Sequence, residues 1–250
     1  MPEALPRLFK ANAGANARAD AVIICLHGFG GTPYEVNPVA KACAAVGLDA
    51  VTVVHPRHGF SRRQVQRREF ARLRQEELMA AAYDVVEQAR QRYARVGIFG
   101  LSMGGAIGLL LAADKRVDAC AVAAAALRLP TAGEILIPLL SWAPFYLPVV
   151  DKYDFHLPAY DFYHSWALRA LWQVSRAARS RLGEIECPVL AVHSQIDDTI
   201  PPLVMDWMQE HISAPLETAW FNQSRHPMPL DVQGDAIATQ VAQTLKRHLL

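Results

Sequence analysis

The chain has 250 residues, of which 52% are hydrophobic and 20% are charged. This composition is that of a folded globular protein and excludes a disordered chain, and the length suffices for one sizeable domain. The 25 Lys and Arg residues nearly balance the 24 Asp and Glu residues, and the net charge of +1 gives no reason to expect a nucleic acid as partner.

The apolar segments and the cysteines bear on the cellular location of the protein. Residues 1–14 contain no apolar core of signal-peptide length, so we expect no export signal. The longest uncharged apolar run, residues 135–150, contains three prolines and is shorter than the roughly 20 residues of a membrane-spanning helix, so we expect no transmembrane segment. The cysteines form no CxxC pair and lie in apolar segments, which favours a reducing, cytoplasmic setting: Cys25, Cys43, Cys120 and Cys187.

Short segments rich in Val, Ile and Leu alternate with helical patterns along the chain. This alternation predicts an α/β fold, in which helices flank a mostly parallel central sheet. Strands are predicted at residues 21–27, 48–54, 95–99, 117–123, 187–193 and 216–221, and helices at residues 34–46, 69–93, 103–113, 203–211 and 235–249.

The alternation is interrupted between residues 129 and 182, where prolines and aromatic residues dominate and no strand pattern is found. This segment is too long for a bare loop inside a compact domain, which predicts a helical cap inserted into a core of residues 1–128 and 183–250. Its apolar side chains, among them Trp142, Phe145 and Tyr146, would either line a substrate pocket or form the cap's own core.

The segment GLSMG, residues 100–104, has the pattern G-x-S-x-G between a predicted strand and a predicted helix. Glycines at both ends leave room for a tight turn that projects the hydroxyl of Ser102 at the carboxyl edge of the sheet. The helix that follows presents free N–H groups toward a developing negative charge. This context predicts that Ser102 is a nucleophile rather than a capping serine in a structural turn.

A serine nucleophile needs a general base, and the base needs a group that orients it. His226 follows the last predicted strand, which favours it over His27 and His193, the other histidines expected near that edge of the sheet. Asp197 and Asp198 follow the preceding strand, and either carboxylate could orient the imidazole.

These residues and the motifs around them resemble the α/β-hydrolase superfamily, above all its small bacterial carboxylesterases and monoacylglycerol lipases. The resemblance covers nearly the whole chain and is carried by LHGFGGTP, PRHG, GLSMGG, CPVLAVHSQIDDTIPP and SRHPMPLD. It implies an α/β-hydrolase fold and favours Asp197 over Asp198, since Asp197 lies four residues before Pro201. It also implies an oxyanion hole formed by the backbone N–H groups of Phe29 and Met103, with the ring of Phe29 in the pocket wall.

Two further patterns concern charged residues. Seven residues between 57 and 74 are arginines, against a single acid, Glu69. Such a run is either a solvated helix face or a basic patch for weak contact with an anionic lipid surface or an acidic partner. No metal site is expected, because Asp151 and Asp154 have no histidine at ligand spacing other than His156.

Together these features predict a serine hydrolase that cleaves small-molecule carboxylic esters of short or medium acyl chains, or monoacylglycerols, through an acyl-enzyme and without a cofactor. The same triad would serve a thioesterase, an amidase or a C–C bond hydrolase, since these reactions differ in the leaving group. A binding protein of the same fold would typically lack a triad member, and all three are present.

Overall fold

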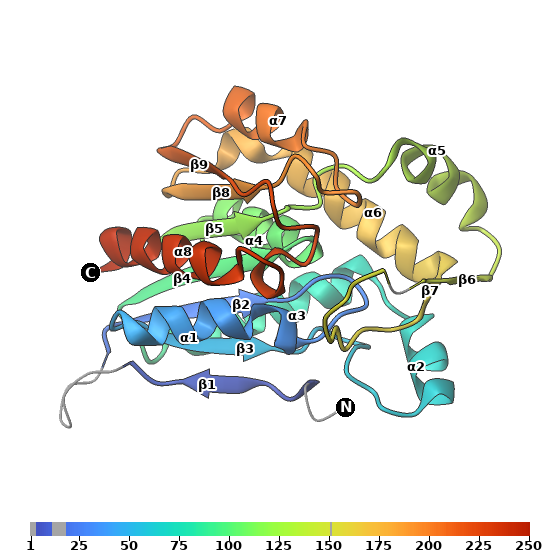
Figure 1. Cartoon of the computed structure of the whole chain (residues 1–250), viewed down its shortest axis with the longest axis horizontal. Coiled ribbons are helices and arrows are strands. Elements are labelled where there is room, and N and C mark those ends of the chain that lie inside the picture. Colours follow the sequence, from blue (N-terminus) through green and yellow to red (C-terminus); the bar gives the residue numbers. More distant parts are fainter. Residues whose placement is uncertain (1–3, 12–18, 151) are drawn as a thin grey trace.

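A seven-stranded sheet forms the centre of the molecule (Figure 1). The computed structural model describes residues 4–11, 19–150 and 152–250, so Asp151 and part of residues 1–14 lie outside the described residues. The strand order is β1-β3-β2-β4-β5-β8-β9, and all these strands run parallel except β1, which pairs antiparallel with β3 at one edge. The mostly parallel sheet predicted from the sequence is confirmed. The strands are β1 (Arg7–Phe9), β2 (Ala21–Leu26), β3 (Asp49–Val53), β4 (Arg95–Leu101), β5 (Ala119–Ala123), β8 (Val189–His193) and β9 (Leu216–Trp220).

Helices cover both faces of this sheet (Figure 1). On β2, Ile23 belongs to the buried cluster that includes residues of α1 and α8. Its neighbours Val22 and Ile24 belong to the cluster on the opposite face, with residues of α3 and α4, as the two-residue period of a strand dictates. The helices are α1 (Asn37–Ala45), α2 (Arg63–Phe70), α3 (Gln75–Arg90), α4 (Met103–Ala113), α5 (Thr131–Leu140), α6 (Ser165–Ser180), α7 (Val204–His211) and α8 (Gly234–Leu249).

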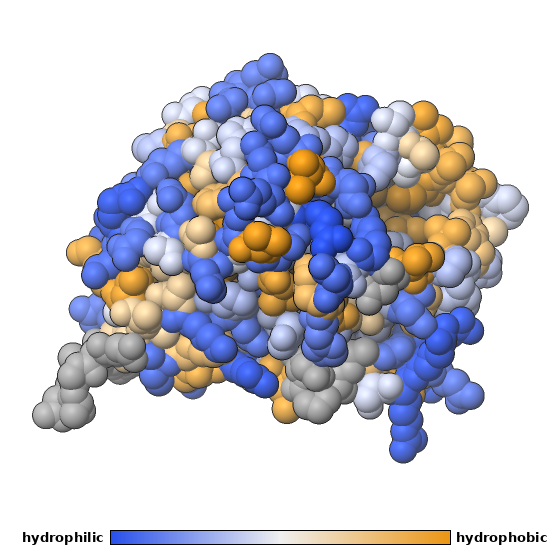
Figure 2. All heavy atoms as spheres, viewed as in Figure 1, coloured by the Kyte–Doolittle hydropathy of each residue, from blue (hydrophilic) through white to orange (hydrophobic). Residues whose placement is uncertain are grey.

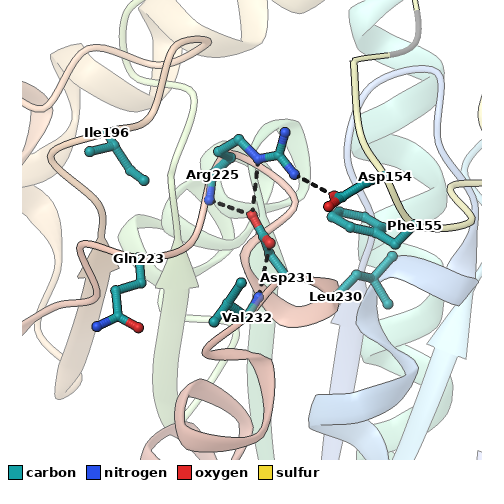
Figure 3. Close-up of a pocket in the computed structure, with 8 residues that line it drawn as sticks. All are labelled: Asp154, Phe155, Ile196, Gln223, Arg225, Leu230, Asp231 and Val232. Atoms are coloured by element: carbon teal, nitrogen blue, oxygen red, sulfur yellow. Dashed lines mark hydrogen bonds and ion pairs between the residues drawn. The ribbon is translucent and has the colours of Figure 1, made fainter.

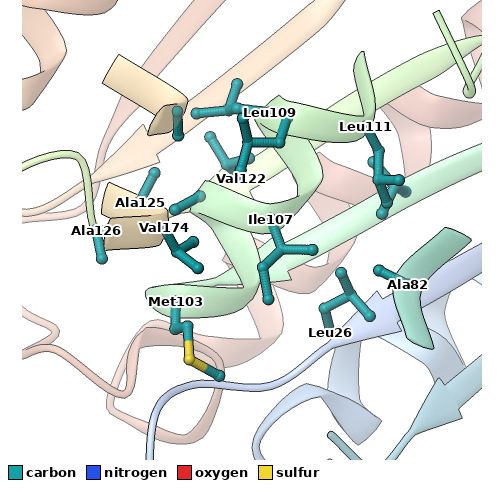
Figure 4. Packing of buried hydrophobic residues seen from close by; sticks show 14 of the residues in the cluster. Leu26, Ala82, Met103, Ile107, Leu109, Leu111, Val122, Ala125, Ala126 and Val174 are labelled. Carbon is teal, nitrogen blue, oxygen red and sulfur yellow. The ribbon is translucent and has the colours of Figure 1, made fainter. Parts of the chain in front are cut away.

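Helix α4 is buried along its whole length. It carries no charged residue and lies between the sheet and α6, and Figure 4 shows Met103 and Ile107 among Leu26, Val122 and Val174. Burial stabilises apolar side chains by roughly 25 cal/mol per Å² of surface removed from water, and a close-packed interior tolerates little movement. The residue that precedes α4 is therefore attached to a rigid part of the core.

The predicted helix at residues 69–93 is wrong as one helix, because α2 ends at Phe70 and α3 begins at Gln75. Phe70 and Leu73 are both fully buried, and the chain turns between the two helices to bury both side chains. Arg74 has extended backbone there, with φ −130° and ψ 149°.

The predicted helix at residues 34–46 begins with a 3-10 turn, η2 (Pro33–Val36), before α1 starts at Asn37. Pro38 lies in the first turn of α1, where its missing N–H costs no hydrogen bond. The edge strand β1 was not predicted, since three residues carry too little pattern to be recognised.

The segment predicted as a helical cap contains α5, α6 and a short antiparallel pair of strands that the sequence did not predict. Strand β6 (Tyr146–Pro148) pairs with β7 (Phe162–His164). Helix α6 packs on α4, whereas α5 has no buried residue. The division of the chain into core and cap at residues 129 and 182 stays a prediction.

Exposed apolar side chains gather over α5 and the chain that follows it, as Figure 2 shows. None of the helices in the described ranges is both long and apolar enough to cross a membrane. The exposed side chains of this apolar face are Ile135, Leu136, Leu139, Leu140, Trp142, Tyr146, Leu147 and Val150.

Candidate active site

Ser102 occupies a strained turn between β4 and α4. Its φ of 55° and ψ of −115° lie in a region that residues with a side chain rarely adopt. The N–H of Ser102 donates to the carbonyl of Ala123 at 2.9 Å, and its carbonyl accepts from the N–H groups of Ala106 and Ala126 at 3.1 and 3.0 Å. The sheet and α4 thus hold this backbone conformation from both sides.

Gly100 and Gly104 permit this turn because a side chain at either position would collide with backbone. A Cβ on Gly100 would lie 2.2 Å from the carbonyl oxygen of Gly104, and a Cβ on Gly104 would lie 2.3 Å from that of Leu26. The glycines of the pattern therefore allow β2, β4 and α4 to approach closely. Met103 is the first residue of α4, so its N–H has no acceptor within the helix.

His226 lies on the loop after β9, and Asp197 lies on the loop after β8. Nδ1 of His226 is 2.9 Å from Oδ2 of Asp197. The other carboxylate oxygen of Asp197 accepts the N–H groups of Thr199 and Ile200 at 2.8 and 2.9 Å. Burial raises the pKa of Asp197, but His226 and these hydrogen bonds outweigh burial and hold the pKa below its ordinary value. Asp197 is therefore an ionised and fixed partner of the imidazole.

Asp198 and His193, the alternatives to Asp197 and His226 that the sequence offered, have different surroundings. Asp198 is exposed and pairs with Lys152. His193 is fully buried, with Nδ1 3.9 Å from Oδ2 of Asp197, and neither of its ring nitrogens has a hydrogen-bond partner in the described part of the chain. Burial lowers the pKa of His193, so this ring is neutral near pH 7.

Ser102, Asp197 and His226 all lie at the carboxyl ends of strands of one parallel sheet. The structure joins Asp197 to His226 directly, whereas no hydrogen bond joins Ser102 to His226 among the residues that the structure describes. In enzymes without substrate such bonds are often long and shorten when the substrate binds.

The loop after β2 has an unused donor at Phe29. The N–H of Gly28 donates to Oε2 of Glu35 at 2.8 Å, and the N–H of Gly30 donates to Nε2 of His58 at 3.1 Å. The N–H of Phe29 between them has no acceptor in the described ranges.

This loop passes directly beside Ser102. A Cβ on Gly28 would lie 3.5 Å from Cβ of Ser102. The free N–H of Phe29 and the first N–H of α4, that of Met103, are thus two donors close to one serine. An oxyanion hole requires two such donors.

Three buried histidines support the loop: His27, His55 and His58. The N–H of His55 donates to Nε2 of His27 at 3.2 Å, and Nδ1 of His58 lies 2.8 Å from the carbonyl oxygen of Pro56. Because Nε2 of His58 accepts the N–H of Gly30, the ring proton of His58 is on Nδ1. Burial lowers the pKa of all three, to about 4 for His55 and to about 3 for His58, so the cluster is uncharged at neutral pH.

A sequence profile of the alpha/beta hydrolase family matches residues 23–240. The chain belongs to this family. It is similar to the thermostable monoacylglycerol lipase of Bacillus sp. (strain H-257), with 27% identity over 242 residues and 90% of each chain covered.

Solved structures share the fold of this hydrolase. One comes from work on LipS and LipT, two metagenome-derived lipolytic enzymes, with a TM-score of 0.89, 22% identity and 99% of both chains covered. Another is the monoacylglycerol lipase of Paleococcus ferrophilus, with a TM-score of 0.80, 16% identity and 98% of both chains covered. The α/β-hydrolase fold is confirmed, and the hydrolase has distant relatives among lipases and esterases.

In this hydrolase the ring of Phe29 belongs to an aromatic cluster. Its centroid lies 4.9 Å from that of Phe70 in α2 and 5.1 Å from that of Tyr163 in β7. Phe162, also in β7, lies 6.0 Å from Phe70. The cluster thus brings aromatic side chains from the cap segment to the loop beside Ser102.

Of the three residues of segment 129–182 predicted to line a pocket, Trp142 is exposed, and Phe145 and Tyr146 have other contacts. Trp142 is 78% exposed, and the guanidinium of Arg67 lies 5.0 Å from the ring centroid of Tyr146. The N–H of Phe145 donates to Oγ of Ser165 at 3.2 Å. Their role in a pocket stays a prediction.

A surface pocket of about 420 Å³ flanks the loop that carries His226 (Figure 3). Arg225, the residue before His226, donates to Asp154 of the cap segment at 2.8 Å and to the carbonyl of Lys152 at 3.0 Å. Its backbone N–H donates to Asp231 at 2.7 Å. Cap residues 152–154 are therefore fastened to the loop of His226, while Lys152 is also paired with Asp198 on the loop of Asp197.

Sequence reasoning gave no catalytic or binding role to Glu35 or His58. The PRHG motif contains His58 and was the available signal for it. Glu35 follows no pattern, and only burial and contact with the Gly28–Gly31 loop distinguish it. Tyr163 is one of the aromatic residues of the segment 129–182, which were predicted to line a pocket or to form the core of the cap.

Proposed function

We propose that this hydrolase cleaves carboxylic esters with Ser102 as nucleophile, His226 as general base and acid, and Asp197 as the residue that orients the imidazole. The observation that carries the proposal is the hydrogen bond between His226 and Asp197 at the sheet edge where Ser102 occupies its strained turn. The two free N–H groups beside Ser102 support it further.

In the proposed reaction Nε2 of His226 takes the hydroxyl proton while Oγ of Ser102 forms a bond to the acyl carbon. The N–H groups of Phe29 and Met103 donate to the oxyanion, and removal of one such donor typically costs roughly 3 kcal/mol of transition-state stabilisation. The tetrahedral intermediate breaks its bond to the alkoxy oxygen, to which His226 returns the proton. Water then attacks the acyl-enzyme, gives its proton to His226, and the proton returns to Oγ of Ser102 as the carboxylic acid leaves.

The substrates that we propose are neutral esters of short or medium acyl chains, or monoacylglycerols. The aromatic cluster around Phe29 and the uncharged histidines suit a neutral and apolar acyl group. The similarity to a monoacylglycerol lipase supports the same class. Each step uses only side chains and backbone N–H groups of the protein and water, so the proposed reaction requires no cofactor.

Thioesters, amides and activated C–C bonds would pass through the same tetrahedral intermediate, and a substrate profile distinguishes them.

A role in the cytoplasm is part of the proposal, and the four free cysteines support it because they suit a reducing compartment.

We also propose weak adsorption to anionic lipid surfaces. The apolar face over α5 is continuous with the arginine-rich helix α2, since the hydroxyl of Tyr146 donates to the carbonyl of Arg67 at 3.4 Å. An apolar face beside a row of cations suits the boundary between acyl chains and anionic headgroups.

The first experiment is hydrolysis of p-nitrophenyl esters from acetate to palmitate by the wild type, Ser102→Ala and Ser180→Ala. Ser180 is an exposed serine at the end of α6 and serves as the matched control. We expect Ser102→Ala to lose at least about a thousandfold in kcat and Ser180→Ala to match the wild type. A fluorophosphonate probe should label Ser102, as detected by peptide mass spectrometry. An unlabelled Ser102, or an active Ser102→Ala variant, contradicts the proposal.

A further inference from the structure

Glu35 is a buried carboxyl group beneath the loop that carries Phe29. It lies in η2 (Pro33–Val36) and is only 6% exposed. Oε2 accepts the N–H of Gly28 at 2.8 Å, and Oε1 lies so close to Gly31 that a Cβ there would be 2.1 Å away. The carboxyl group therefore touches both ends of the Gly28–Gly31 loop.

The same carboxyl group lies close to Ser102. Oε2 of Glu35 is 3.2 Å, and Cβ of Ser102 is 3.5 Å, from the point that a Cβ on Gly28 would occupy. The backbone of Gly28 thus lies between Glu35 and the proposed nucleophile, Ser102. A shift of Gly28 would move the next N–H, that of Phe29, relative to Oγ of Ser102.

The carboxyl group of Glu35 keeps its proton to an unusually high pH. Burial raises the pKa of Glu35 to about 7, although the N–H of Gly28 lowers it. A protonated carboxyl group still has an oxygen that accepts the N–H of Gly28, so this contact does not require the charge.

Other charges near Glu35 are few. The segments packed against η2 are β2, β3, β4, α1 and η4 (Met228–Leu230), and the cap adds Tyr163, whose pKa burial raises to about 12. His27 and His55 follow β2 and β3 and are kept neutral by burial. The titratable side chains of these segments and of the loops beside them are Cys25, His27, Tyr34, Lys41, Cys43, Asp49, His55, Arg95, Tyr163 and His226.

We propose that Glu35 is a positioning residue for the hydrolysis proposed above: its carboxyl group anchors the Gly28–Gly31 loop so that the N–H of Phe29 faces the oxyanion. This inference rests on the proposed function of Ser102 and His226. It assigns one task to the side chain, that of acceptor for the N–H of Gly28.

Two variants test the anchor. Glu35→Gln keeps an oxygen that accepts the N–H of Gly28, so kcat stays within about threefold of the wild type. Glu35→Asp keeps the carboxyl group, but its shorter side chain does not reach Gly28, so kcat falls at least about tenfold while KM stays within about twofold. Both are measured at pH 8 on p-nitrophenyl butyrate.

The matched control is Glu134→Gln. Glu134 also accepts one backbone N–H, that of Leu129 at 2.8 Å, and we expect this variant to reproduce the wild-type kcat. Wild-type kcat in Glu35→Asp overturns the proposal. Equal losses of kcat in Glu35→Asp and Glu35→Gln also overturn it, because that pattern indicates a purely structural role.

Amide hydrogen exchange followed by NMR repeats the comparison without turnover. The N–H of Gly28 should exchange at least about tenfold faster in Glu35→Asp than in the wild type or in Glu35→Gln. This readout tests the anchor even if Ser102→Ala retains activity, so failure of the present inference and failure of the proposed function are distinguishable.

Discussion

Nδ1 of His226 lies 2.9 Å from Oδ2 of Asp197, whereas the adjacent carboxylate, Asp198, pairs with Lys152. Asp197→Asn should therefore lower kcat by about 10²- to 10⁴-fold, because an amide no longer fixes the tautomer or stabilises the imidazolium. Asp198→Asn, one residue away, should stay within about threefold of the wild type, since its exposed ion pair contributes little. Comparable losses in the two variants would contradict this assignment. Steady-state kinetics at pH 8 provide the measurement.

The two glycines of α4 at positions 104 and 108 should respond differently to alanine. A Cβ on Gly104 would lie 2.3 Å from the carbonyl oxygen of Leu26, whereas a Cβ on Gly108 would meet Ile98 at 3.6 Å, an ordinary contact. Gly104→Ala should cost at least about 3 kcal/mol of unfolding free energy, and Gly108→Ala should gain up to ~1 kcal/mol from helix propensity. Urea unfolding tests this order, and a stable Gly104→Ala variant would show that β2 and α4 can separate.

Glu35 should make the folded state less stable as the pH rises. Its pKa is about 7 in the folded chain against an ordinary value of 4.5, so between these pH values the folded state binds more protons than the unfolded state. The contribution of Glu35 to stability is greatest below pH 4.5 and is lost as the pH rises to about 7. Glu35→Gln should thus match the wild type near pH 4.5 and exceed its unfolding free energy by up to about 3 kcal/mol at pH 8. Equal urea midpoints of the two proteins at pH 8 would refute this.

The stability of the contacts around Arg225, beside His226, should depend on Asp231 more than on Asp154. Both bind Arg225, but the side chain of Asp154 is 89% exposed and that of Asp231 is 4% exposed. Asp231 also accepts the N–H of Val232 at 2.9 Å. Asp231→Asn should cost about 1–3 kcal/mol of unfolding free energy and Asp154→Asn less than about 0.5 kcal/mol. Thermal unfolding of the two variants in parallel decides the order.

Adsorption to lipid should depend on α5 and on charge. We expect the wild type to bind phosphatidylglycerol vesicles more strongly than phosphatidylcholine vesicles, with binding that weakens as salt increases. Leu136→Ser combined with Leu139→Ser should reduce sedimentation with vesicles at least about fivefold. Leu8→Ser in β1 removes an equally exposed leucine and serves as control. Equal binding of all three proteins would exclude α5 as the contact.

The sequence predicted those parts of the molecule in which neighbours in the chain are also neighbours in space. The turn at Ser102 was predictable because strand, glycines and helix follow one another within a few residues. His226 was predictable from its place after the last strand, whereas the place after the preceding strand left Asp197 and Asp198 open, and only the resemblance to the family selected Asp197. By contrast, the surroundings of Glu35 come from backbone that folds over it from other parts of the chain. The break after Phe70 follows from the burial of Phe70 and Leu73, and no helix-breaking residue marks it in the sequence.

The neutrality of the three histidines bears on how the acid product would leave. The proposed substrate is an uncharged ester, whereas the acid that it yields is an anion at neutral pH. The neutral rings of His27, His55 and His58 offer that anion no positive charge. An ionised Glu35 would repel the anion across the Gly28–Gly31 loop. The proposed site would therefore bind the ester more tightly than the carboxylate product, and accumulated acid product would inhibit turnover little.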